Sequence, residues 1–474
     1  MDLILSILYA LLVISLIVVI ISENRNPLKA TSWLLVITLI PIAGILLYFL
    51  FGQDQRRRHI MNRRVYKRLM RRPKFLSIPN EVLSKMSDSQ ITPLMRLLKR
   101  NSDNPVLFAT QSQIFTDGKS KISSLLEDIK MARNHIHIQY YIIENDEYGN
   151  ELADQLIEKA KQGVRVRLIY DHVGCWNTKR SFWEKLRKGG VEVYPFMPVV
   201  FPLFTSRVNY RNHRKLVIID GKIGYFGGMN IAKRYIDGNK LGLWHDTHIR
   251  IEGSAVASLQ TSFLIDWYVV SRRVINIEGC FHGPDTPTPK ETDIPMQIIP
   301  GGPIGEWRSL EQAITFLMSR ATKYVYITTP YFLPTETLSN AITTAALAGI
   351  EVRLLIPKKS DTKFAQVASL SYIQDMLSAG VKVFFYTGGF LHAKMVVVDD
   401  KVASVGSTNM DFRSLEHNFE LNAMIYKPEM VIALKNCIID LLNDSEKIEI
   451  ERWQQRSRFQ KFMESCIRLF APLL

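Results

Sequence analysis

Two stretches of this sequence decide its fold: His213-Arg-Lys-Leu-Val-Ile-Ile-Asp-Gly-Lys222 and His392-Ala-Lys-Met-Val-Val-Val-Asp-Asp-Lys401. In each, a β-branched run leads to an Asp-Gly or Asp-Asp pair and a short return run, which is typical of a β-hairpin. Gly227-Gly-Met-Asn230 follows the first stretch and Gly406-Ser-Thr-Asn409 follows the second at the same spacing. A lone His-x-Lys would carry little information, but two such extended copies are hard to attribute to chance.

Strand geometry predicts how the basic residues of each motif are used. Side chains alternate between the two faces of a strand, so His213 and Lys215 point the same way, as do His392 and Lys394. An ammonium neutralises phosphate oxygens, and a neighbouring imidazole is suited to nucleophilic or proton-transfer chemistry. The pattern therefore predicts phosphodiester chemistry, with one histidine from each copy.

The remaining polar residues of the motifs are expected to differ in role. By the same parity, Asp220 and Asp399 lie on the other face of a regular strand, so we expect them to brace the hairpins. Asn230 and Asn409 lie in the loops that follow and are better placed to donate to a phosphate. Ser407, beside the second of these loops, is a further candidate for substrate binding.

The repeat extends beyond the motifs. Residues 133–142 resemble 323–332, residues 163–170 resemble 349–356, and residues 190–194 resemble 380–384. Each of these segments is expected to be a strand, and amphipathic helical stretches separate them. This alternation predicts an α/β fold, with two α/β/α sandwich halves in a pseudo-two-fold arrangement.

The halves are expected at residues 106–290 and 291–474, joined near the Pro/Thr-rich stretch 283–292. Glycine 190 precedes its motif histidine by 23 residues and glycine 380 by 12, so the first half carries 11 extra residues. They fall around 195–204, which is too rich in proline for a helix. This segment is either an apolar loop that enters lipid or lines an acyl-chain groove, or a buried connection.

The amino-terminal region has the composition of a membrane hairpin. Apolar runs at about 3–21 and 33–51, within residues 1–52, approach the ~20 residues that cross a bilayer. The first run lacks the basic flank and small-residue cleavage site of a signal peptide. Residues 56–74 hold ten Lys/Arg and no acidic residue. By the positive-inside rule, this basic juxtamembrane segment, part of 53–105, places the amino terminus and the catalytic body in the cytoplasm.

Composition narrows the class of partner. The 474 residues carry a net charge of +15, which indicates an anionic partner, either nucleic acid or an acidic membrane surface. The basic segment next to the second run can attract anionic headgroups, or serve only as a topology signal. The four cysteines are far apart with no CxxC pair, which favours free thiols over a metal site or disulfides.

The duplicated motif resembles the signature of the phospholipase D superfamily over about residues 106–445. The resemblance implies that the two motifs form one active site without metal or cofactor. Lys215, Asp220, Lys394 and Asp399 would then belong to the catalytic motif. One histidine attacks phosphorus and the other protonates the leaving alcohol, and the resemblance favours His213 as the nucleophile. A carboxylate usually holds each histidine. The downstream candidates are Asp246 and Glu420.

Within this superfamily, the whole chain resembles the bacterial cardiolipin synthases. Residues 25–29, 33–35 and 51–52 of the anchor and the basic amphipathic stretch 452–468 carry this resemblance. It implies transfer of a phosphatidyl group between two phosphatidylglycerols, giving cardiolipin and glycerol. It also implies a multi-pass protein of the bacterial cell membrane that binds phosphatidylglycerol and anionic lipids but no nucleic acid. A membrane-bound phospholipase D or nuclease is the alternative, because the motif alone does not separate transfer from hydrolysis.

Overall fold

The computed structural model describes residues 2–22, 27–48, 52, 61, 63–70, 88, 90–199, 210–276, 278–282 and 289–471. The chain forms two compact units. One contains residues 1–58 with 199–210, and the other contains 59–198 with 211–474. The predicted apolar loop falls at 195–204, and its residues 200–204 lie outside the described residues. The described part of the larger unit holds both motifs.

The smaller unit contains three helices, α1 (Asp2–Ser22), α2 (Pro27–Leu39) and α3 (Pro41–Leu47). Leu16 and Ile20 of α1 pack against Ile37 and Tyr48 in a small buried cluster. Other apolar side chains of α1, including Leu11, Ile14 and Val18, are exposed. The described helices of this unit therefore enclose a small core and expose apolar side chains.

Of the second predicted span, 33–51, the structure describes residues 33–48, which fall largely in α2 and α3. Helix α2 begins before this span, at Pro27, and ends at Leu39. The helical conformation is interrupted at Ile40, and α3 begins at Pro41. A proline has no N–H to continue the helical hydrogen bonds, so a break at this position is expected physically. Residues 49–51 lie outside the described residues. Among the helices that the structure describes, none is both long and apolar enough to cross a membrane.

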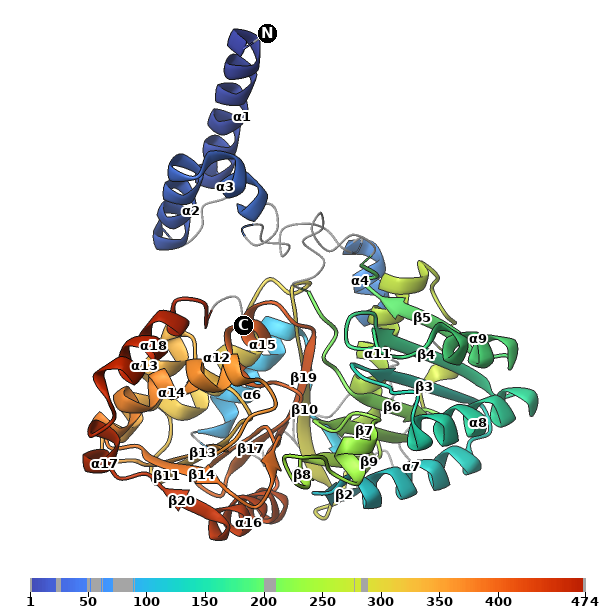
Figure 1. Ribbon diagram of the computed structural model, residues 1–474. Coiled ribbons are helices and arrows are strands. Elements are labelled where there is room, and N and C mark those ends of the chain that lie inside the picture. The colour runs from blue at the N-terminus through green and yellow to red at the C-terminus, as the bar shows by residue number, and fades with distance from the viewer. Residues whose placement is uncertain are drawn as a thin grey trace. The chain divides into compact units, whose positions relative to one another are not determined.

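The first half of the larger unit is built on a seven-stranded mixed sheet (Figure 1). In spatial order its strands are β2 (Gln111–Phe115), β9 (His248–Glu252), β7 (Ile223–Gly227), β6 (Leu216–Ile219), β3 (His135–Tyr140), β4 (Arg165–Asp171) and β5 (Glu192–Phe196). Strands β3, β4 and β5 are parallel, and the motif strand β6 pairs antiparallel with β3 and β7.

Helices cover both faces of this sheet. They are α7 (Gly118–Met131), α8 (Glu147–Lys161), α9 (Arg180–Lys188), the short α10 (Lys233–Ile236) and the long buried α11 (Val256–Ser271). Val217 and Ile219 of β6 belong to the same core as α7, α8 and α9. Leu216 and Ile218 belong to the core that contains α11. The β-branched run after His213 is therefore buried on both faces of the sheet, as a strand inside a three-layer sandwich must be.

The second half repeats this plan on a nine-stranded sheet. In spatial order its strands are β1 (Leu107–Ala109), β10 (Ile294–Gly301), β19 (Glu420–Ile425), β17 (Val402–Gly406), β16 (Met395–Val398), β11 (Tyr324–Thr328), β13 (Glu351–Pro357), β14 (Lys382–Tyr386) and β20 (Ser445–Lys447). The helices are α12 (Ser309–Ser319), α13 (Glu336–Leu347), α14 (Lys363–Ser378), α15 (Phe412–Glu416), α16 (Pro428–Asn443), α17 (Ile450–Gln454) and α18 (Arg458–Arg468). The two motif strands β6 and β16 thus occupy corresponding places, so the expected repeat of α/β halves is confirmed.

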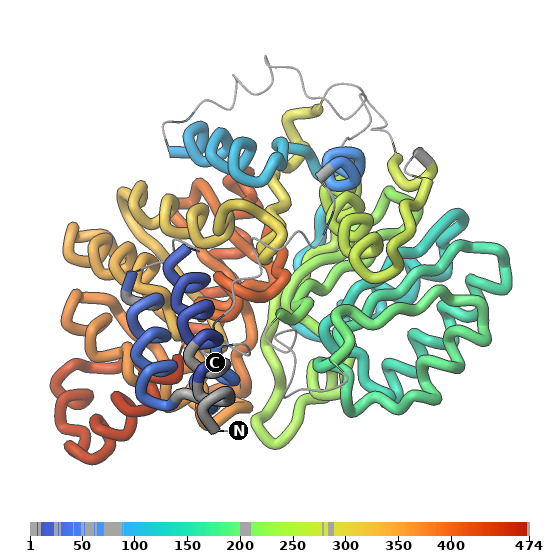
Figure 2. The backbone as a smooth tube through the Cα atoms, turned by 90° about the horizontal axis from the view of Figure 1, so that it is seen from above, coloured from blue at the N-terminus to red at the C-terminus, as the bar shows by residue number. Residues whose placement is uncertain are grey.

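The two halves share one hydrophobic core. It runs from Phe263 of α11 through Ile298 of β10 to Val405 and Leu421 of the second sheet. The first half, green, and the second half, orange and red, lie side by side in Figure 2. The continuous core fixes the halves against each other, which any site built from both of them requires.

Three segments near the predicted boundaries pack in specific places. Helix α4 (Arg63–Met70), within the basic stretch, buries Leu69 in the shared core beside α11. Helix α6 (Ile91–Ser102) packs on α12 and β10 of the second half. Strand β1 also joins the second sheet, although we expect the first half to begin at residue 106. The chain crosses between the sheets at Thr110, because β2 directly afterwards pairs with β9.

Both motifs form the predicted hairpins. Strand β6 pairs with β7, and β16 pairs with β17. Asp220 and Gly221 in the first turn, and Asp399 and Asp400 in the second, have positive φ angles between 54° and 67°. Such angles match the right-handed twist of the flanking strands, which is why Asp-Gly and Asp-Asp stand there. Each regular strand begins three residues after its histidine.

Candidate active site

Main-chain pairing between the halves positions both histidines. The N–H of His213 donates to the Phe419 carbonyl oxygen at 2.9 Å, and the N–H of His392 donates to the His245 carbonyl oxygen at 2.7 Å. Next to the second contact, β15 (Phe390–Leu391) pairs with β8 (Trp244–His245). The segment before each motif strand is therefore held by the opposite half. For this reason the regular motif strands begin only after the His-x-Lys residues.

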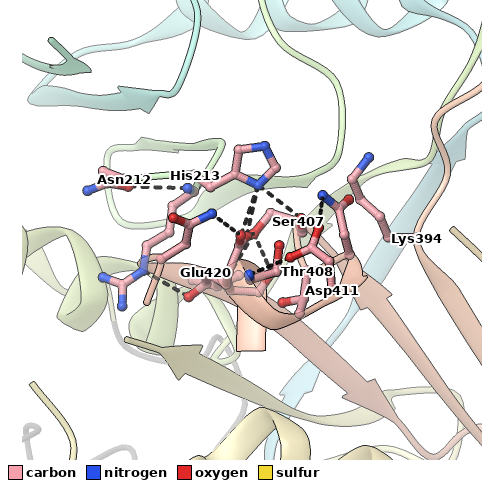
Figure 3. Close-up of polar contacts among 12 residues, drawn as sticks. Asn212, His213, Lys394, Ser407, Thr408, Asp411 and Glu420 are labelled. Atoms are coloured by element: carbon pink, nitrogen blue, oxygen red, sulfur yellow. Dashed lines mark hydrogen bonds and ion pairs between the residues drawn. The ribbon is translucent and has the colours of Figure 1, made fainter. Parts of the chain in front are cut away.

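These main-chain contacts between the halves also place a carboxylate beside each histidine. Glu420 directly succeeds Phe419, and its carboxylate lies 3.0 Å from Nδ1 of His213. The carbonyl oxygen of Ser407 lies 3.1 Å from the same nitrogen (Figure 3). Two acceptors on Nδ1 place its proton there and leave Nε2 with a free lone pair. His213 is thus oriented by a carboxylate from the other half.

His392 is held in the same way by the first half. Asp246 directly succeeds His245, and its Oδ2 lies 2.5 Å from Nδ1 of His392. The sequence nominates Asp246 and Glu420 as the supporting carboxylates without pairing them. The structure pairs each with the histidine of the opposite half, so neither half contains a complete site.

The residue after the motif glycine differs between the halves. A side chain at Gly228 would meet Oδ1 of Asp246 at 2.0 Å, so only glycine fits beside this carboxylate. At the corresponding place in the second half, Ser407 donates its hydroxyl to Glu420 at 2.5 Å. Ser407 is buried and is not among the residues that line the cavity. Our prediction that it binds substrate is therefore not supported by its position, since its hydroxyl is directed at Glu420.

The two lysines lie beside the histidines and are buried. The ammonium of Lys215 donates to the carbonyl oxygen of His213 at 2.5 Å. That of Lys394 donates to the carbonyl oxygen of His392 and lies 2.8 Å from its Nδ1. Burial lowers the pKa of Lys215 to about 7 and that of Lys394 to about 8. A bound anion would stabilise the protonated lysines, because its charge offsets the cost of burying theirs.

Burial and charge pairing set the protonation of the histidines and carboxylates. Burial is the main reason that the pKa of His213 is lowered, and Glu420 opposes this shift. Burial likewise lowers the pKa of His392 to about 4, and Asp246 opposes that shift. Burial alone would raise the pKa of each carboxylate. The neighbouring histidines and lysines outweigh it and lower both values. At neutral pH the site therefore holds neutral imidazoles beside ionised carboxylates.

The motif aspartates lie away from the histidines. The Asp220 carboxylate accepts from the backbone N–H groups of Arg133, Asn134 and His135 at 2.7–2.9 Å. Asp399 accepts from the corresponding residues 322–324 at 2.7–2.9 Å. Neither aspartate lines the cavity. In the structure the two carboxylates thus support the turns before β3 and β11, and the catalytic role that the resemblance implies for them stays a prediction.

Both histidines open onto one cavity of about 450 Å³. Asn230 and Asn409 also line it. The Asn230 amide donates to the Tyr235 hydroxyl at 2.7 Å, and the Asn409 amide donates to Asp411 at 3.1 Å. The side-chain oxygen of Asn409 is buried and has no hydrogen-bond partner among the described residues. The structure therefore brings the predicted histidines and asparagines together at one cavity. The predicted lysines lie against the histidines and do not line the cavity.

Further lining residues were not predicted. Tyr141 and Tyr331 occupy the same place in the repeated segments 133–142 and 323–332, and both line the cavity. Arg234 and Arg413 each follow the motif asparagine by four residues and also line it. The repeat itself was thus the signal that could have identified these pairs. The other lining residues are Ile142, Arg211, Tyr235, Trp244, Leu333, Asp361, Thr362, Ala365, Asp411, Ser414 and Asn418.

This arrangement is a site for phosphodiester transfer of the phospholipase D type. A nucleophile and an opposed acid are needed, and two similar halves supply one oriented histidine each. In the described part of the chain, no group of three or more His, Cys, Asp or Glu residues is arranged to hold a metal ion.

Comparison with known proteins identifies the family. The family model described as "Cardiolipin synthase, PLD-like domain" matches residues 125–267 and 314–465, one match in each half. A phospholipase D-nuclease N-terminal model matches residues 10–53. The chain belongs to the cardiolipin synthase family and is a phosphatidyltransferase.

Individual relatives agree over nearly the full length. The chain is 38% identical to a cardiolipin synthase of Halalkalibacterium halodurans, over 99% of this chain and 93% of that protein. It is 39% identical to the major cardiolipin synthase of Bacillus subtilis, over 100% of this chain and 99% of that protein. The crystal structure of a phosphatidylserine synthase of Haemophilus influenzae superposes with a TM-score of 0.60. It is 16% identical and covers 81% of this chain and all of that one, which shows a shared fold.

Proposed function

We propose that the protein transfers a phosphatidyl group from one phosphatidylglycerol to another through a phosphohistidine, releasing glycerol and forming cardiolipin. The observation that carries this proposal is that each histidine is held by a carboxylate of the opposite half. His213 is held by Glu420 and His392 by Asp246, and both imidazoles line one cavity. A double displacement on a single phosphorus needs one imidazole with a free Nε2 and an opposed imidazole that can donate a proton, both held in place.

In the first step, Nε2 of His213 attacks phosphorus while His392, which the charge of the bound anionic substrate holds in its protonated form, gives the proton of its Nε2 to the departing glycerol oxygen and becomes neutral. The proton on Nδ1 of His213 stays against Glu420, which stabilises the positive charge on the substituted ring. In the second step, His392 takes the proton of an incoming alcohol, and that alcohol displaces His213. The assignment of His213 as nucleophile follows from the family resemblance.

Cations and amides around the histidines suit the charge of this reaction. Arg234, Arg413 and the amides of Asn230 and Asn409 line the cavity, and the buried ammonium groups of Lys215 and Lys394 lie beside the histidines. Their charges and dipoles favour a phosphodiester and its transition state. Enzymes remove about 8–23 kcal/mol from such barriers. Preorganised charged donors of this kind usually supply the largest single part of such a reduction. No part of the proposed reaction needs a metal or cofactor.

The acceptor of the phosphatidyl group determines whether the enzyme is a synthase, which uses a lipid alcohol, or a hydrolase, which uses water. A patch of exposed apolar side chains beside the cavity favours a lipid acceptor. It consists of exposed side chains on α14 and on or next to α18, two helices that pack against each other: Phe364, Phe459, Phe462, Met463, Leu469 and Phe470. The rings of Phe364 and Phe470 lie 6.3 Å apart, and Phe364 stands between the cavity-lining residues Thr362 and Ala365.

This patch would bring lipid to the cavity. Arg458, Lys461 and Arg468 of α18 accompany its aromatic side chains, a combination that suits an anionic bilayer surface. A nuclease would instead need basic and stacking groups along a strand-binding groove. We therefore infer that phosphatidylglycerol and anionic lipids are the partners, and that nucleic acid is not.

Membrane attachment is proposed from the amino-terminal unit. Residues 1–52 would form a two-span anchor, with spans at about 3–21 and 33–51, in the bacterial cytoplasmic membrane. The match over residues 10–53 and the apolar exterior of α1 support this. The basic segment within 53–105 would keep the two halves, 106–290 and 291–474, on the cytoplasmic side. Protease digestion of sealed right-side-out and inverted vesicles tests this: the body should be cleaved only in inverted ones.

The reaction is tested with the purified full chain in detergent and phosphatidylglycerol labelled in both its acyl chains and its headgroup glycerol. We expect label in cardiolipin and an equal molar amount of free glycerol. Phosphatidic acid as the main lipid product would show a hydrolase instead. A His392→Ala variant with undiminished turnover would contradict the shared two-histidine site.

A further inference from the structure

Four pairs of cavity-lining residues come one from each half: His213 and His392, Asn230 and Asn409, Tyr141 and Tyr331, and Arg234 and Arg413. Arg211, Tyr235 and Asn418 line the cavity without such a counterpart, and the two lining carboxylates, Asp361 and Asp411, both come from the second half. Both carboxylate oxygens of Asp411 already accept hydrogen bonds. Oδ1 accepts from the backbone N–H of Ser414 at 2.6 Å as the cap of α15, and Oδ2 accepts from the Asn409 amide. The paired residues suit a phosphoryl group that both halves share. Asp361 needs another explanation.

Asp361 is exposed and lies in the loop between β13 and α14. Its Oδ1 accepts from the Tyr331 hydroxyl at 2.7 Å and, more weakly, from the hydroxyls of Ser360 and Thr362 at 3.3 and 3.5 Å. Within the described residues, no donor reaches Oδ2. Tyr331 is itself cavity-lining and half-buried, so it fixes the carboxylate at the wall with one oxygen still able to accept a hydrogen bond.

Asp361 and His392 line the same cavity, and the charge of Asp361 acts on His392. Burial and Lys394 lower the pKa of His392, while Asp246 and, after it, Asp361 act in the opposite direction. The charge of Asp361 is also felt by Lys394 and by Arg234, whose pKa values it raises in opposition to burial. His392 is the histidine that exchanges protons with the alcohols in the proposed reaction. Asp361 is therefore near the place where an alcohol enters and leaves.

A carboxylate is an unfavourable neighbour for a phosphodiester, because the two negative charges repel. It is a strong acceptor for hydroxyl groups, since O–H···O⁻ bonds are roughly twice as strong as neutral ones. The headgroup of phosphatidylglycerol ends in two vicinal hydroxyls, one terminal and one secondary. We propose that Asp361, held by Tyr331, accepts a hydrogen bond from the secondary hydroxyl and so directs the terminal hydroxyl to His392. This inference deepens the proposed transfer and rests on it.

The step balances as a proton-coupled displacement. The terminal hydroxyl oxygen forms the new P–O bond as the P–Nε2 bond to His213 breaks, and its proton passes to Nε2 of His392. The bonding pair returns to His213, which becomes neutral. Asp361 gives and takes no proton. It determines which alcohol is used, so it is a specificity residue of the acceptor subsite.

Competition between glycerol and 1,3-propanediol tests the subsite, since the two alcohols differ only in the secondary hydroxyl. The purified full chain in detergent receives phosphatidylglycerol and equal amounts of both alcohols, each carrying its own label. Label in phosphatidylglycerol and in phosphatidylpropanediol is then counted. Both products arise from the same phosphatidyl-enzyme, so their ratio is independent of folding, expression and the first step.

We expect the wild type to favour glycerol by about tenfold or more, and Asp361→Asn to bring the ratio close to one. Tyr331→Phe should reduce the preference in part. Asp154→Asn, an exposed aspartate on α8, is the matched control and should leave the ratio unchanged. A wild type that does not discriminate, or an Asp361→Asn variant that keeps its preference, overturns the subsite alone. Failure to incorporate either alcohol overturns the proposed transfer and the subsite with it.

Discussion

Asp246 belongs to the first half of the chain, yet its Oδ2 lies 2.5 Å from Nδ1 of His392 in the second half. Glu420 and His213 repeat this relationship in the opposite direction at 3.0 Å. Each histidine thus depends on the other half for its tautomer and orientation. The duplication is therefore functional as well as structural, because separated halves would each have an unsupported imidazole.

The first prediction concerns these carboxylates. Asp246→Asn should lower kcat by about 10³–10⁴-fold, because the amide supports the wrong tautomer of a buried histidine, as in other His-carboxylate pairs. Glu420→Gln should have a similar effect. Initial rates on phosphatidylglycerol micelles measure this, with circular dichroism to confirm folding. A loss below about tenfold in both variants would show that the carboxylates do not orient the histidines.

The second prediction separates two roles for Ser407. Its hydroxyl donates to Glu420 at 2.5 Å, so Ser407→Ala should lower kcat about tenfold and leave KM for phosphatidylglycerol unchanged. A residue that binds substrate would instead raise KM. Steady-state kinetics over a range of substrate concentrations decides between them, and a raised KM with normal kcat would restore the role expected from the sequence.

The third prediction is a pH dependence of anion binding. Burial lowers the pKa of Lys215 to about 7 and that of Lys394 to about 8. Each lysine attracts an anion only while protonated, so sulfate should inhibit best near pH 6 and progressively less well up to pH 9. The inhibition constant should rise by up to about tenfold per pH unit and per lysine above these values. Lys394→Met should flatten the dependence, whereas an inhibition constant that ignores pH would contradict it.

The fourth prediction concerns stability. Although burial raises the pKa of Asp399, the backbone N–H groups of residues 322–324 outweigh it and lower the value overall. A lowered pKa in the folded state means that the stabilisation is present above the unfolded value of about 3.8 and is lost as pH falls through the folded value.

Asp399→Asn should therefore reduce the free energy of unfolding on the order of 1–3 kcal/mol at pH 7. The difference from wild type should shrink below about pH 4. Thermal melts at pH 7 and pH 3 measure both effects. Asp154→Asn serves again as the exposed control, and a difference that persists unchanged at pH 3 would show that ionisation of Asp399 is not its source.

The sequence predicted the parts of this site that repeat. Two motif copies at equal spacing were enough to predict the hairpins, the two α/β halves and the histidines, because strand periodicity and turn residues are local properties. The pairing of Asp246 with His392 was not predictable in the same way. It depends on contacts such as His392 with His245, which join segments 147 residues apart and form only when the halves pack together.

Asp361 was missed for a related reason. It belongs to no motif and has no counterpart among the cavity residues of the first half, so nothing in the repeat marks it. The role of Ser407 could not be read from the motif, because the motif loop brings it near the site without showing which way its hydroxyl turns. Tyr141 and Tyr331, by contrast, were present in the aligned repeats as a visible pair.

The unequal roles of the two histidines are tested most directly by trapping the covalent intermediate. The wild-type enzyme is mixed with phosphatidylglycerol labelled at phosphorus, quenched in alkali within milliseconds and digested, and the labelled peptide is identified by mass spectrometry. We predict a phosphatidyl group on His213 and none on His392. Label on His392, or quenched enzyme that carries no label while turnover proceeds, would contradict the mechanism.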